Sequence, residues 1–111
     1  EVAKQFMTKL VLGETDAVVQ LMDDIVLGSA DINELKGGIM NSRQVVVSRF
    51  GEGIPQMELV AGEPITYDGL PANLIVLKVE NLTAFGYYDF IMNDATDKVI
   101  LMENNGRVYL K

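Results

Sequence analysis

The residues best suited to chemistry lie in the stretch TAFGYYDFIMND, residues 83 to 94. Within it Tyr87 and Asp89 stand two residues apart, so on a β-strand both side chains would project from the same face. A carboxylate beside a phenol could work as a general acid–base pair. Asp89 and Tyr87 are therefore the candidate catalytic residues, and Phe85, Tyr87 and Asp89 are candidate ligand or interface residues. The alternative is a solvated aspartate on a strand whose aromatic residues pack against their neighbours.

The residue types that are missing exclude much of enzyme chemistry. The chain contains no His and no Cys, which removes Ser–His and Cys–His dyads, thiol nucleophiles and the usual zinc sites. Asp23-Asp24 and the loop Asn93–Asp97 are rich in oxygen ligands but lack the spacing of a calcium-binding EF-hand loop. An acidic helix end and an Asx-type turn explain these two segments better. We expect no metal site and no cofactor.

Charge and hydropathy exclude two kinds of partner. Nine basic against sixteen acidic residues give a formal charge of -7, and the basic residues are scattered, so the surface would repel phosphate groups and we expect no nucleic acid partner. No apolar run approaches the roughly 18 residues that a membrane-spanning helix needs. The chain enters a helical pattern at once and has no initiator Met, so we expect a piece of a longer protein.

The first part of the sequence predicts helices. Apolar residues recur at helical spacing from Val2 until Gly13 ends the pattern. A second helix is predicted with Thr15 as its N-cap, continuing to Gly28, which would place Asp23-Asp24 near its C-terminal end.

Asp31 resembles the N-cap of a third helix, because a carboxylate, Glu34, follows three residues later. The apolar stripe of this helix runs as far as Phe50. Gly37-Gly38 and the β-branched run at residues 45–47 weaken its second half.

After Pro55 the period of the apolar residues changes from 3.6 to 2, which predicts an antiparallel sheet of four to five strands. Gly62 and Pro64 mark the first strand as an edge strand or a bulged one. Asp68-Gly69 and Asn105-Gly106 are typical of tight hairpin turns. The second turn would place Glu103 opposite Val108 and Met102 opposite Tyr109. The predicted strands span residues 56–67, 72–81, 85–93, 99–103 and 107–111.

Strand geometry divides the aromatic stretch between two faces. One face carries no charge and is the better candidate for the side under the helices; it consists of Gly86, Tyr88, Phe90 and Met92. The other carries Asp89 and is expected to face water, a partner subunit or the mouth of a cavity; it consists of Phe85, Tyr87, Asp89 and Ile91.

Helices followed by a meandering antiparallel sheet define an α+β fold in a single domain, residues 1–111. This order, with three helices (EVAKQFMTKLVLG, TDAVVQLMDD, DINELKGGIM) packed on a curved sheet, resembles the cystatin-like cone of the nuclear-transport-factor-2-like superfamily. The segments VLGETDAVVQLMDD and VILMENNGRVYLK are similar to small bacterial secreted lipoproteins of unknown function in that superfamily. Such proteins often carry Trp in the last strand, where this chain has Tyr109.

The resemblance implies a cone with a cavity between helices and sheet, a small apolar ligand, frequent homodimers and an extracytoplasmic, secreted or lipid-anchored location. We therefore expect a non-enzymatic binding or assembly domain. The alternative is a small lyase, isomerase or hydrolase similar to ketosteroid isomerase, with Asp89 and Tyr87 in the cavity. A sheet that is apolar on both faces adds an expectation of dimerisation through one face. A third hypothesis is a module that binds a partner along an exposed strand edge.

Overall fold

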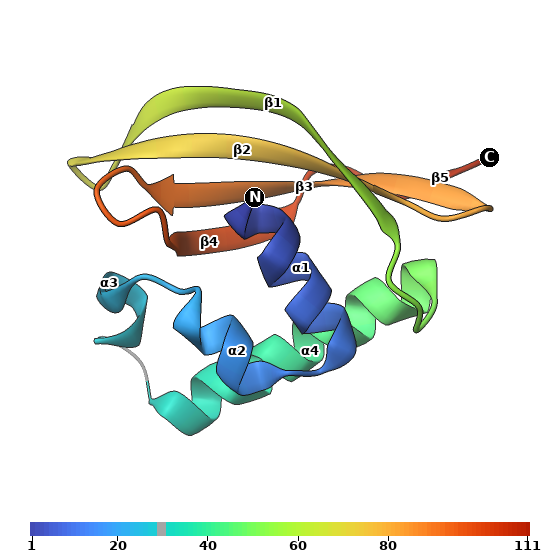
Figure 1. Cartoon of the computed structure of the whole chain (residues 1–111), viewed down its shortest axis with the longest axis horizontal. Coiled ribbons are helices and arrows are strands. Elements are labelled where there is room, and N and C mark those ends of the chain that lie inside the picture. Colours follow the sequence, from blue (N-terminus) through green and yellow to red (C-terminus); the bar gives the residue numbers. More distant parts are fainter. Residues whose placement is uncertain (29–30) are drawn as a thin grey trace.

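The computed structural model describes residues 1–28 and 31–111 and has an α+β architecture, as predicted. Helices lie on one side of an open antiparallel sheet (Figure 1). The helices in the described part of the chain are α1 (Val2–Leu12), α2 (Thr15–Gln20), α3 (Asp24–Leu27) and α4 (Ile32–Phe50). The strands there are β1 (Gln56–Tyr67), β2 (Leu70–Glu80), β3 (Ala84–Asn93), β4 (Val99–Asn104) and β5 (Tyr109–Leu110).

The helix ends follow from local sequence. Gly13 ends α1 with a φ of 76°, a left-handed conformation that costs glycine little. Asp31 caps α4 as expected, since its carboxylate accepts hydrogen bonds from the backbone N–H groups of Asn33 and Glu34. The helix then runs without a break through Gly37-Gly38 to Phe50. Its buried stripe outweighs the low helix propensity of these two glycines.

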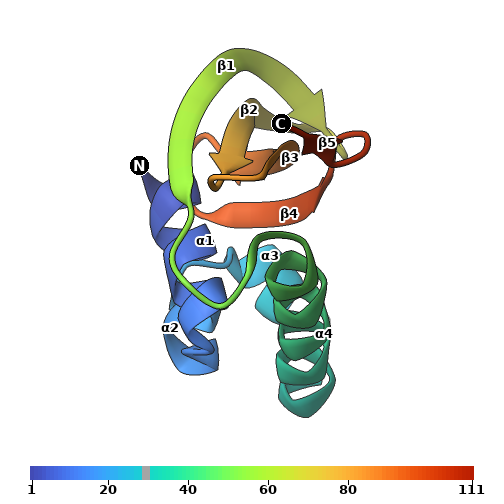
Figure 2. The same cartoon turned by 90° about the vertical axis from the view of Figure 1, so that its right-hand side faces the viewer.

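The sheet has the order β1-β2-β3-β4, and β1 is an edge strand that arches over its neighbours (Figure 2). Asp68 and Gly69 both have positive φ and join β1 to β2 in the predicted tight turn. The register of β1 shifts between Leu59 and Ala61, so its irregularity precedes Gly62. Every residue from Glu58 to Pro64 is exposed, which leaves this middle part of the edge strand packed on neither face.

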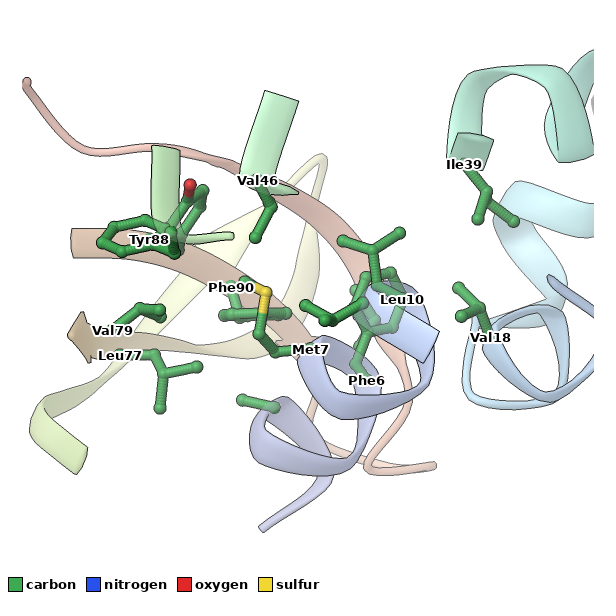
Figure 3. Packing of buried hydrophobic residues seen from close by; sticks show 14 of the residues in the cluster. Phe6, Met7, Leu10, Val18, Ile39, Val46, Leu77, Val79, Tyr88 and Phe90 are labelled. Carbon is green, nitrogen blue, oxygen red and sulfur yellow. The ribbon is translucent and has the colours of Figure 1, made fainter. Parts of the chain in front are cut away.

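The core lies between the helices and one face of the sheet (Figure 3). Phe6 of α1 meets Phe90 of β3 edge to face, with ring centroids 5.6 Å apart. Tyr88, Phe90 and Met92 are buried, and Tyr87 and Asp89 are only partly so, which confirms the predicted division of β3 into two faces. Burying each large apolar side chain contributes roughly 1.5–3 kcal/mol before the entropy of ordering is counted.

The prediction of one second helix was wrong, because the segment forms two short helices, α2 and α3. Thr15 is the first residue of α2 and Glu14 occupies the N-cap position without a side-chain hydrogen bond. Between α2 and α3, the chain forms a parallel bridge from Met22 to Val99 at the edge of β4. Asp23 then caps α3, so its carboxylate lies at a helix N-terminus, where it is favourable, and not at a C-terminus.

The predicted C-terminal hairpin was also wrong. Met102 lies opposite Phe90 and Glu103 opposite Asp89, while Tyr109 of β5 pairs with Phe85. Both β4 and β5 thus pair with β3 along the same edge of the sheet. Asn105-Gly106 lies in the short segment that leaves this edge between the two strands. No helix in the described part of the chain is long and apolar enough to cross a membrane.

Candidate ligand cleft and outer sheet face

An apolar cleft of about 320 Å³ opens between the helices and β4. Its wall combines residues of α1, α4 and β4, because α1 and α4 both lie under β4 (Figure 2). Most of the lining is apolar, with Ser42 and the exposed Glu34 as the polar exceptions among side chains. The lining residues are Phe6, Leu10, Met22, Val26, Glu34, Leu35, Gly38, Ile39, Ser42, Val99, Ile100, Leu101 and Met102.

Gly38 helps to keep this cleft open. It lies in the middle of α4 and lines the cleft, and a Cβ atom added to it would have no heavy atom within 4 Å apart from its chain neighbours and the adjacent backbone of α4. The neighbouring Gly37 has equally free space but does not line the cleft. A glycine in a helix interior costs about 1 kcal/mol relative to alanine. Gly38 therefore lowers the stability of α4, and its lack of a side chain leaves the cleft unfilled at this position.

The break between α2 and α3 supplies the end wall of the cleft. The backbone N–H of Asp23 donates to the Val99 carbonyl over 2.8 Å, and the Val99 N–H donates to the Leu21 carbonyl over 2.9 Å. These two bonds hold Met22 and Val26 beside β4. The carboxylate of Asp23 accepts hydrogen bonds from the Thr96 hydroxyl and the Ile25 N–H, and these bonds lower its pKa against the opposing effect of burial.

The predicted site residues lie on the other face of the sheet, away from the cleft. Phe85, Tyr87 and Asp89 alternate with the buried residues of β3 and are all half-buried. Asp89 accepts a hydrogen bond of 2.8 Å from the side-chain amide of Asn105. None of the three residues lines the cleft. The acid–base hypothesis for Asp89 and Tyr87 therefore stays a prediction, and the cleft does not support it.

Phe85 and Tyr87 belong to an aromatic cluster whose third member, Tyr109, was not predicted from the sequence. Phe85 stacks on Tyr109, with ring centroids 5.1 Å apart, and Tyr87 meets both rings edge to face. The Lys78 ammonium lies 5.0 Å from the Phe85 centroid, and the Arg107 guanidinium lies 5.5 Å from that of Tyr109. Tyr109 was missed because the predicted hairpin placed it against Met102.

The outer face, defined here as the sheet face that carries Asp89, is covered by none of the described helices. Its apolar residues are half-buried but do not pack against the main core. Ala72 is only 2% exposed and likewise stands apart from the core cluster. The apolar residues that the register places beside one another on this face are Ile65, Leu74, Val76 and Ile91, with Leu101 on the edge strand β4, which also borders the cleft.

Family models, curated proteins and solved structures give no match to this chain. The resemblance to cystatin-like cones stays a hypothesis, and function is inferred from the cleft and the outer face.

Proposed function

We propose that this chain is a non-enzymatic binding domain that takes a small apolar ligand into the cleft between α1, α4 and β4. The apolar cleft of about 320 Å³ carries this proposal. Its volume is at the lower end of the range of small-molecule pockets, and its apolar lining with few polar groups is typical of them. The resemblance to a cystatin-like cone, and to secreted or lipid-anchored bacterial proteins with that fold, would agree with such a role.

The size of the cleft limits the ligand. A dry apolar cavity of roughly 150 Å³ accepts a benzene molecule, so a cleft of about 320 Å³ would hold on the order of ten carbon atoms. A ligand of that size, bound mainly by apolar contact, is expected to have a dissociation constant between about 1 μM and 1 mM.

Filling the cleft from the protein side tests the proposal. The substitution Gly38→Leu adds a side chain at a position that lines the cleft. Gly37→Leu adds the same side chain one residue away, at a position outside the lining. Isothermal titration calorimetry with 1-octanol should detect binding to the wild type and to Gly37→Leu. Binding to Gly38→Leu should weaken at least tenfold. No binding to the wild type, or equal binding to all three proteins, would remove the cleft as a ligand site.

Assembly through the outer face is a second candidate function. A half-buried apolar stripe that no described helix covers favours it, since contiguous exposed apolar surface commonly marks an interaction site. Its test concerns the oligomeric state and is independent of the cleft.

A further inference from the structure

A second, smaller pocket adjoins the cleft. It has a volume of about 190 Å³ and lies between α4 and β4, beyond Ser42 and Met102. Because Ser42 and Met102 also line the apolar cleft, the two spaces meet at these side chains. A single elongated molecule could therefore occupy both.

The side chain at the base of this pocket is a buried tyrosine whose hydroxyl lacks a well-formed hydrogen bond. Tyr88 is only 2% exposed, and its hydroxyl makes no hydrogen bond of good geometry with a described residue, although the Arg49 side chain lies near enough to interact with it. Figure 3 shows its oxygen on the side of Tyr88 that faces α4, and Val46 of α4 also lines the pocket. Leaving a buried hydroxyl without a well-formed hydrogen bond is costly, so such a hydroxyl at the border of a pocket points to a further polar partner.

The polar groups around Tyr88 are mainly hydrogen-bond donors. Ser42 lines the pocket from α4, and Asn104 lies opposite Tyr88 in the β3–β4 register, so its side chain shares the helix-covered face. Arg49 lies two helical turns after Ser42 on the same side of α4. Burial raises the pKa of Tyr88 above its ordinary value of 10.0, and hydrogen bonding and charge from Arg49, which lies beside the pocket and not in its lining, act in the opposite direction. Glu103 also lines the pocket, but its side chain belongs to the outer face with Asp89.

We propose that the ligand of the cleft is an amphiphile with one carboxylate head group, and that Tyr88, Arg49 and Asn104 bind this head group in the adjoining polar pocket. This inference rests on the proposed function of the cleft. Hydroxyl, amide and guanidinium donors match the acceptor oxygens of a carboxylate. Arg49 is the one cation assigned to this head-group site, and the chain as a whole carries a net charge of -7. Both facts favour a monoanion over a more highly charged phosphate.

Matched ligands separate the two proposals. Octanoate and 1-octanol have the same chain length and differ in the head group, and both can be titrated calorimetrically into the wild-type chain. We expect octanoate to bind about tenfold more tightly than 1-octanol, because hydrogen bonds to a charged group are stronger than those to a neutral one. If 1-octanol binds and octanoate gains nothing over it, the head-group inference fails while the cleft stands. If neither binds, the proposed function fails as well.

Matched variants then test the residues. Tyr88→Phe removes only the hydroxyl and should weaken octanoate binding five- to tenfold while leaving 1-octanol binding unchanged. Arg49→Gln should also weaken octanoate binding selectively. Arg107→Gln removes the same charge from the exposed outer-face cluster and should have no effect. Equal octanoate affinity in the wild type, Tyr88→Phe and Arg49→Gln would overturn the assignment, and so would an equal loss of affinity for both ligands.

Discussion

At the scale of single residues, Asp23 connects the helical half of the molecule to the sheet. Its side chain caps α3 and accepts a hydrogen bond from Thr96, which is 73 positions later in the sequence. These bonds favour the ionised carboxylate and lower its pKa below the ordinary value of 3.8. Asp23 therefore stabilises the fold at pH values above about 3.8, and this stabilisation is lost as the pH falls through the lower pKa of the folded state.

We predict that Asp23→Asn reduces the free energy of unfolding at pH 7 by about 1 kcal/mol, because the amide can still cap the helix but its hydrogen bonds are no longer charge-assisted. Urea unfolding between pH 7 and pH 3 measures the difference, which should shrink as the pH falls below 4. Asp24→Asn, at the exposed neighbouring position, is the control and should show a smaller difference. A difference for Asp23→Asn that is the same at every pH would contradict this role.

The candidate site could be predicted from single residues only in part. The two-residue period of β3 correctly separated Tyr88 from Tyr87 and Asp89. It gave no sign that Tyr88 would lack a well-formed hydrogen bond, because this depends on Ser42, Arg49 and Asn104, which come from other elements. The wide sequence separation of these residues is set by packing and leaves no local pattern.

At the scale of elements, local signals were reliable where the partner of a strand or helix was its neighbour in sequence. Asp31 marked the start of α4, and Asp68-Gly69 marked the β1–β2 turn. The Asn105-Gly106 signal failed although Gly106 does adopt a positive φ of 84°. A bulge-like excursion needs the same backbone conformation as a hairpin turn. What decides between a hairpin and such an excursion is whether the two flanking segments pair with each other or both pair with β3.

The helix α4 offers a stability test of its glycines. Gly37 lies in the helix interior, is exposed, and would gain a Cβ that meets nothing within 4 Å. We predict that Gly37→Ala raises the free energy of unfolding by about 0.5–1 kcal/mol, since alanine loses less backbone entropy in a helix. Chemical denaturation with an unchanged m-value would measure this gain.

Gly13→Ala is the contrasting variant for that experiment. Gly13 has a φ of 76°, and an added Cβ would lie 3.3 Å from Nε of Arg43, whose guanidinium donates to the Val11 carbonyl. Both strain and crowding should make this variant less stable by at least about 1 kcal/mol. A loss of stability in Gly37→Ala would show that α4 needs a glycine there for a reason other than helix propensity.

At the scale of the whole molecule, one sheet face is covered by helices and the other is not. The outer face combines the apolar stripe around Val76 with the aromatic cluster. Its charges are mostly acidic, because the register places Glu58, Glu63, Glu80, Asp89 and Glu103 there with Lys78, and Arg107 lies over the Tyr109 ring. If two copies met through this face, the carboxylates would come close together and repel one another. Salt screens such repulsion, while apolar contact is not weakened by it.

We therefore predict that the chain forms homodimers through the outer face, and that raising the salt concentration strengthens them. Light scattering at high micromolar concentration should give the mass of two chains. Val76→Lys places a charge in the half-buried stripe and should give the mass of one chain. Leu82→Lys changes a residue that is 96% exposed in the β2–β3 loop and should leave the dimer intact. A single-chain mass for the wild type at every concentration and salt level would show that the outer face does not bind a second copy, and the cleft would remain as the proposed site.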